Sequence, residues 1–320
     1  MKLTEIISES YEHIKQEITA EILDKPYSSS IVHRNIQNEY RKYIAAIDRT
    51  FEFPEALTTE SSYYFIAQKN ARPLGELITK EDITRFCFDE IILEDPRKTK
   101  STGYFLSALI EAREDYLKNE HINNEYKKNK NTSDRETYTI ITRHLNTLLD
   151  GLCFNNTANV LIDGDCGNFA CKKMQKGTVT INGDCGNYCA IQMRGGTITI
   201  NGNVHDFVCD GMEDGNVTIF GNAEMAAGMY MSGGILSVTS AKHQLGTGMK
   251  GGTIFVNDEC GYGIGFNMVG GTIYLVSAQS KKQIIKNISP VHIGGEIYHN
   301  TKRLTTTWKR FKQFFERILK

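Results

Sequence analysis

The sequence predicts a chain of two parts, an α-helical N-terminal region followed by a parallel β-helix of about seven rungs, with an amphipathic helix at the C-terminal end. Three observations predict this fold class. Only Gly75 and Gly103 of the 28 glycines precede residue 150, whereas four of the five prolines do. After that point a short motif returns at a nearly constant period. Residues 301–320, finally, carry seven basic groups and one acidic group.

Residues 1–117 are predicted to form an α-helical domain, because apolar residues three and four positions apart share one face of a helix. Thr79 and Asp82 resemble a capping box, which marks a helix start. No motif in this region indicates a reaction. The predicted apolar stripes are Ile7, Tyr11, Ile14, Ile18 and Ile22; Val32, Ile36, Tyr40, Tyr43 and Ile47; Ile83, Phe86 and Ile91; and Phe105, Leu106, Leu109, Ile110 and Leu117.

Two segments connect this domain to the glycine-rich part of the chain. Residues 118–133 are rich in Lys, Asn and Glu without periodicity, so we expect a flexible linker. Residues 134–150 are expected to form a helix that caps the solenoid, with Tyr138, Ile141, Leu145 and Leu148 on one face.

Residues 151–300 contain an internal repeat, which is typical of a solenoid. Each copy has a strand of about five residues, rich in Val, Ile and Thr and bounded by glycine turns, with no room for a helix. Successive coils must then pair parallel strands about 4.8 Å apart. The methionines that define the repeat are evenly spaced, except that the fifth coil is one position short, and are Met174, Met193, Met212, Met231, Met249 and Met268.

Three inward columns are predicted, because alternate residues of a strand face the same side. One column is the methionine column. The other two are Val179, Ile198, Val217, Leu236, Ile254 and Ile273, and Ile181, Ile200, Ile219, Val238, Val256 and Leu275. Residues 159–164 are expected to form the first, divergent coil.

The copies "GMYMSGG" (228–234), "GTGMKGGTI" (246–254) and "GFNMVGGTI" (265–273) resemble the GXGXG repeats shared by the C-terminal domain of the glutamate synthase large subunit and by a subunit of formylmethanofuran dehydrogenase. The resemblance covers residues 155–280 and implies a right-handed β-helix. It also implies a scaffold that packs against catalytic subunits without a reaction of its own. The sequence departs from the family at Cys171, Ala190 and Cys209, where later coils have glycine. These departures favour a standalone relative.

Two groups of residues include metal-ligand types. Cys166 and Cys185 share a column on adjacent rungs, and stacked thiolates can hold zinc or an iron–sulfur cluster. That column continues as Val204 and Ala223, so we favour packing.

His205, Glu224 and His243 recur at the period of the repeat, which suits a metal site or an acid–base set. The short fifth coil could move His243 out of line, so we favour a solvated face. Repeating Asp and Asn residues and the set Phe169, Tyr188 and Phe207 are interpreted as structural stacks. The sequence therefore predicts no catalytic residue, cofactor or metal.

Residues 301–320 are predicted to form a basic amphipathic helix with Trp308, Phe311, Phe315 and Ile318 on one face. Such a helix can cap the solenoid, dock on a partner or lie on an anionic membrane. We favour the cap.

Composition limits the classes of function. The basic excess lies in residues 301–320, so we expect no nucleic-acid partner, and no apolar run reaches the roughly 18 residues of a membrane span. A cytoplasmic protein with eight free thiols is expected. The favoured function is a non-catalytic scaffold or protein-interaction module. The alternatives are an accessory subunit of a redox or amidotransferase complex and, third, a carbohydrate-active β-helix enzyme.

Overall fold

The computed structural model describes residues 30–52, 60–89, 96–123, 136–276 and 279–304. It divides into two units, one of residues 1–150 and 158–164 and the other of residues 151–157 and 165–320. The helix expected over residues 7–22 and nearly all of the helix expected over residues 301–320 lie outside the described residues. No helix among the described residues is long and apolar enough to cross a membrane.

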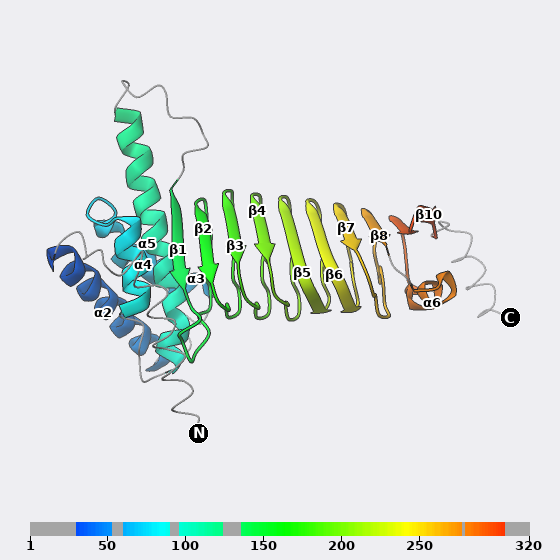
Figure 1. Ribbon diagram of the computed structural model, residues 1–320, viewed down its shortest axis with the longest axis horizontal. Coiled ribbons are helices and arrows are strands. Elements are labelled where there is room, and N and C mark those ends of the chain that lie inside the picture. Colours follow the sequence, from blue (N-terminus) through cyan, green and yellow to red (C-terminus); the bar gives the residue numbers. More distant parts are fainter. Residues whose placement is uncertain (1–29, 53–59, 90–95, 124–135, 277–278, 305–320) are drawn as a thin grey trace. The chain divides into compact units, whose positions relative to one another are not determined.

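The first unit contains three helices that the apolar stripes predict (Figure 1). They are α2 (Ser30–Glu52), α4 (Lys80–Asp89) and α5 (Pro96–Asn123). No stripe predicts the other two helices, α3 (Glu60–Ala71) and the 3-10 helix η2 (Arg72–Leu74). The capping box is confirmed: the Thr79 amide donates to Asp82 Oδ2 (2.9 Å) and the Asp82 amide to Thr79 Oγ1 (3.2 Å). The predicted stripe of α2 is buried throughout, and Tyr40 and Tyr43 pack against Phe86 and Phe105.

Two expectations for the connecting segments are wrong. Helix α5 continues to Asn123, so residues 118–123 of the predicted linker are helical, and residues 124–135 lie outside the described residues. The helix predicted over residues 134–150 is instead strand β1 (Thr137–Ile141), followed by turns. The segment TYTII consists of β-branched and aromatic residues, which favour a pleated surface. Tyr138 and Ile140, two positions apart, are both fully buried, whereas Leu148 is exposed.

Strand β1 has a parallel strand on one side and a helix against it. It pairs in register with β2 (Asn159–Asp163). From α4, Thr84 Oγ1 donates to the Thr139 carbonyl (2.8 Å) and Cys87 Sγ to the Ile141 carbonyl (3.3 Å). A helix that satisfies backbone acceptors of an end strand is one way in which proteins close a sheet.

The second unit is the predicted β-solenoid, with parallel strands lying side by side in sequence order (Figure 1). All three inward columns are buried as predicted, and paired positions keep the register of the repeat. The strands are β3 (Thr178–Ile181), β4 (Thr197–Ile200), β5 (Asn216–Met225), β6 (Ile235–His243), β7 (Thr253–Val256), β8 (Thr272–Leu275) and β9 (Glu296–His299).

The C-terminal end of the solenoid contains two elements that the repeat does not predict. Helix α6 (Lys281–Asn287) lies between β8 and β9, and the Ser280 side chain caps it by accepting from the Gln283 amide. Strand β10 (Lys302–Arg303) folds back antiparallel to β9. This reversal places a short, differently oriented strand against the last parallel one.

Each coil turns one corner with alternate residues in the left-handed backbone region. The middle position of this corner has φ of 57–59° at Cys171, Ala190 and Cys209 and of 64–67° at Gly228, Gly246 and Gly265. A Cβ at Gly246 would lie 2.7 Å from Ile273 Cδ1, and one at Gly228 would lie 2.5 Å from Ile254 Cδ1. Later coils therefore need glycine because isoleucine methyl groups occupy that space.

Candidate functional site

The thiols of the first coils lie inside the solenoid. Cys166 and Cys185 pair on adjacent rungs, and their column continues through Val204 and Ala223, as the sequence predicted. All eight cysteines are free and buried. Burial raises the pKa of the Cys209 thiol, and a hydrogen bond to Cys166 together with burial raises that of Cys185. Such thiols stay protonated near neutral pH and behave as small apolar groups.

The described residues contain no group of three or more His, Cys, Asp or Glu side chains arranged to hold a metal ion. The structure also separates the histidines of the second candidate set. His205 follows Val204 and Glu224 follows Ala223, and Val204 and Ala223 pair on adjacent rungs. The equivalent position of the next rung is Lys242, which forms an ion pair with Glu224 (2.5 Å).

His243 lies one column away from that position. It pairs in register with Met225, and its ring stacks on Tyr262 with centroids 4.0 Å apart. The fifth coil is one residue shorter than the others. Its inward columns nevertheless stay in register, so the shorter length changes the outward positions and moves His243 by one column. His205, Glu224 and His243 therefore do not form one cluster.

Two ladders of Asp and Asn side chains connect the coils. In each ladder a side-chain oxygen accepts a hydrogen bond from the backbone amide one repeat later, at 2.6–3.1 Å. The acceptors are Asp165, Asp184 and Asn203 in one ladder and Asn168, Asn187 and Asp206 in the other. These side-chain oxygens connect the turns of adjacent coils, which agrees with the structural interpretation of the ladders.

The aromatic set also stacks as predicted. The ring centroids of Phe169 and Tyr188 are 5.2 Å apart and those of Tyr188 and Phe207 are 5.0 Å apart, with nearly parallel rings. The rings therefore present their faces to one another, which leaves their edges for solvent.

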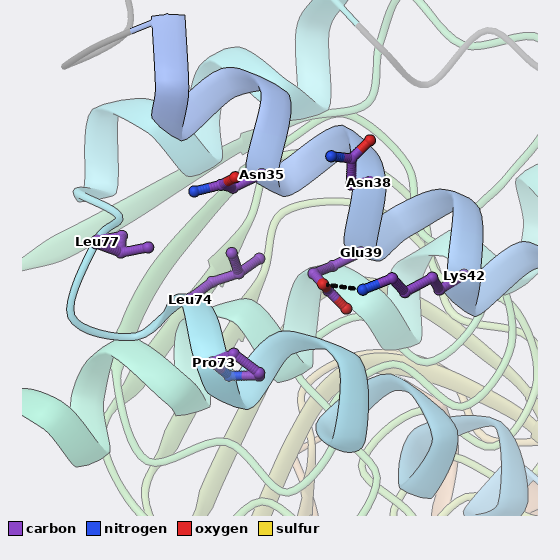
Figure 2. A pocket seen from close by; sticks show the side chains of 7 residues that line it. All are labelled: Asn35, Asn38, Glu39, Lys42, Pro73, Leu74 and Leu77. Carbon is purple, nitrogen blue, oxygen red and sulfur yellow. Dashed lines mark hydrogen bonds and ion pairs between the residues drawn. The ribbon is translucent and has the colours of Figure 1, made fainter.

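In the first unit, an open hollow of about 590 Å³ lies between α2 and the segment around η2 (Figure 2). Asn35, Asn38 and the Glu39–Lys42 ion pair (2.6 Å) line one side. Apolar side chains, Pro73, Leu74 and Leu77, line the other. This lining provides amide and apolar contacts, and its two charged groups neutralise each other.

The most distinctive surface is the outward face of strands β3 to β9, which sequence reasoning missed. Its central column reads Thr180, Thr199, Thr218, Ser237, Phe255, Tyr274 and Tyr298. The last three rings stack with centroids 5.0 Å apart.

The flanking columns stay polar at most positions, including Thr253, Thr272 and Glu296, and each contributes only isolated apolar residues. Ile235 is 43% exposed and Val276 is 52% exposed, whereas β3 and β4 have Thr and Asn at the corresponding positions. We call the surface formed by Ile235, Phe255, Tyr274, Val276 and Tyr298 the aromatic face. An aromatic residue at the middle position of the late strands was the signal that could have revealed it.

In comparisons with known proteins, no family model matches the chain and no curated protein matches it. The resemblance to the GXGXG repeats stays a prediction.

Proposed function

We propose that this protein is a non-catalytic scaffold that binds another protein through the outward surface of its solenoid. The polar groups that could perform chemistry support this proposal by their structural roles. Asp184 and Asp206 accept hydrogen bonds from backbone amides, Glu224 is paired with Lys242, and the thiols are buried. An enzyme would instead need such groups to converge on one substrate position.

The observation that carries the proposal is the uneven distribution of exposed apolar side chains. Among the described residues of the second unit, the large exposed ones all lie within residues 220–293: Phe220, Met225, Tyr230, Ile235, Tyr262, Phe266, Val269, Val276 and Ile293. Single exposed apolar residues are ordinary, but their concentration in the later coils is typical of an interaction site. The strands that carry this surface pair with one another from coil to coil, and a preorganised surface lowers the entropic cost of binding.

The test is affinity capture of the native protein followed by measurement of the stoichiometry of whatever remains bound. A variant with Phe255→Ser and Tyr274→Ser should lose the partner. The matched control is Thr199→Ser, which lies in the same column on the polar half of the face. The control should retain the partner at the wild-type ratio.

Two results would contradict the proposal. One is loss of the partner in the control as well as in the aromatic variant. The other is a measurable turnover by the purified protein that disappears on His205→Gln or Glu224→Gln, since these substitutions touch neither the columns nor the aromatic face.

A further inference from the structure

The dimensions of the aromatic face indicate what can cover it. From the rung of Ile235 to that of Tyr298 it extends over three rung spacings, or about 14 Å, and its three outward columns span about 13 Å. The resulting area, about 200 Å², is far below the roughly 800 Å² per partner of a stable protein interface. This face alone is therefore too small to hold a second copy of the solenoid, and a partner protein would have to contact the wider outward surface as well. One α-helix, about 10 Å across, fits it.

The described chain ends at the border of this face. The Leu304 amide donates to the Ile297 carbonyl (2.8 Å), and the Leu304 side chain is buried. Arg303 forms an ion pair with Glu296 (3.0 Å), and the Tyr298 hydroxyl donates to the same carboxylate (2.7 Å). These contacts fix the point from which the segment 305–320 starts.

This segment matches the aromatic face in length and chemistry. Trp308, Phe311, Phe315 and Ile318 span ten positions, which is about 15 Å along a helix, against the 14 Å estimated for the face. They share one helical face, and the basic residues lie elsewhere. Attachment at Leu304 also gives the segment a millimolar effective concentration at this surface.

We propose that residues 305–320 dock as an amphipathic helix along the aromatic face of their own chain. The docking itself needs no partner. The docking proposal can therefore be tested on the purified chain alone, whatever the outcome of the capture experiment.

Trp308 is the only tryptophan of the protein, so its fluorescence reports directly on the segment. In the purified full-length chain we expect a blue-shifted emission that acrylamide quenches weakly and that is independent of protein concentration. Tyr274→Lys should shift the emission to the red and raise the quenching constant severalfold. Thr199→Lys, in the same column but on the polar half, should leave both unchanged. Circular dichroism of each variant checks that the solenoid is intact.

A second measurement locates the segment without changing the solenoid. With p-benzoylphenylalanine in place of Phe311, irradiation should produce crosslinks to β6, β7, β8 or β9 of the same chain. The proposal is overturned by solvent-exposed Trp308 emission in the wild type, or by protection that survives Tyr274→Lys or depends on concentration. It is equally overturned by crosslinks elsewhere, or by a blue shift that appears only with anionic phosphatidylserine vesicles.

Discussion

At the scale of single residues, the cysteines show how position determines reactivity. The thiolate is the nucleophilic form of cysteine, and burial disfavours it. Burial raises the pKa of Cys87 and of Cys260 to about 12, and the cysteines of the first coils also lie inside packed columns. The thiols are therefore unreactive for two reasons: they stay protonated, and reagents cannot reach them.

We expect the native protein to react with none of its eight thiols when Ellman's reagent is added at pH 8 (about half a unit below the ordinary cysteine pKa). The same reagent in guanidinium chloride should label all eight. The colour released in each condition counts the thiols. Fast labelling of one or more cysteines in the native protein would show that a coil opens locally or that an interior position is misassigned.

At the scale of the element, the corner of each coil combines a left-handed backbone with close packing. Gly246 has both features, since its φ is 64° and a Cβ would lie 2.7 Å from Ile273 Cδ1. Ala190 occupies the equivalent position of an earlier coil, with φ of 58°, so an alanine is tolerated where no isoleucine methyl intrudes. At Gly246 the neighbouring coil therefore contributes to the need for glycine.

Gly246→Ala should therefore lower the free energy of unfolding by about 1–3 kcal/mol, because the added methyl overpacks the interior and strains the backbone. Ile273→Val alone should cost about 0.5–1.5 kcal/mol, since it removes one buried methyl group. In the double variant the two losses should be clearly less than additive, because valine lacks the clashing Cδ1 atom. Urea unfolding of the four proteins measures this coupling, and strict additivity would contradict the packing explanation.

The same scale shows which elements sequence reasoning can and cannot find. Strands β3 to β8 were predictable because each repeats the same alternation and the inward columns reinforce one another from coil to coil. Strand β1 was assigned as a helix because Tyr138 and Ile141 are also three positions apart, and only pairing with β2 decides between the two periods. Helix α6 and strand β10 interrupt the repeat, so its period contains no information about them.

At the scale of the whole molecule, stability in a solenoid is shared between neighbouring coils. Ile200 is fully buried in β4, between the coils of β3 and β5, whereas its neighbour Thr199 faces outward. Two adjacent positions of one strand thus face opposite sides.

We expect Ile200→Asp to unfold the solenoid, because an unpaired buried charge costs several kcal/mol against a typical total stability of roughly 5–15 kcal/mol. Thr199→Asp should melt close to the wild type. Thermal melts followed by circular dichroism provide the comparison. Equal melting temperatures for the two variants would mean that the assigned inward and outward sides are wrong.

The candidate site was less predictable than the fold. The stacks of Asp, Asn and aromatic residues follow from the period, because equivalent positions meet on adjacent rungs. The separation of His205 from His243 depends on where the short fifth coil absorbs its deletion, which the sequence leaves open. To predict the aromatic face, one would have to know the outward register of every strand. The insertion of α6 hides this register at the end, because it makes the spacing from β8 to β9 longer than the regular period.

The late position of β10 has a consequence for synthesis of the protein on the ribosome. Translation adds about 5–20 residues per second, so one coil emerges about every 1–4 seconds. Until residues 302–303 have emerged, each newest coil presents an unpaired parallel strand to other nascent chains of the same polysome. Before β10 has been synthesised, misassembly between neighbouring chains therefore competes with completion of the solenoid. Slow translation of the late coils should lower the yield of soluble protein more than slow translation of the helices.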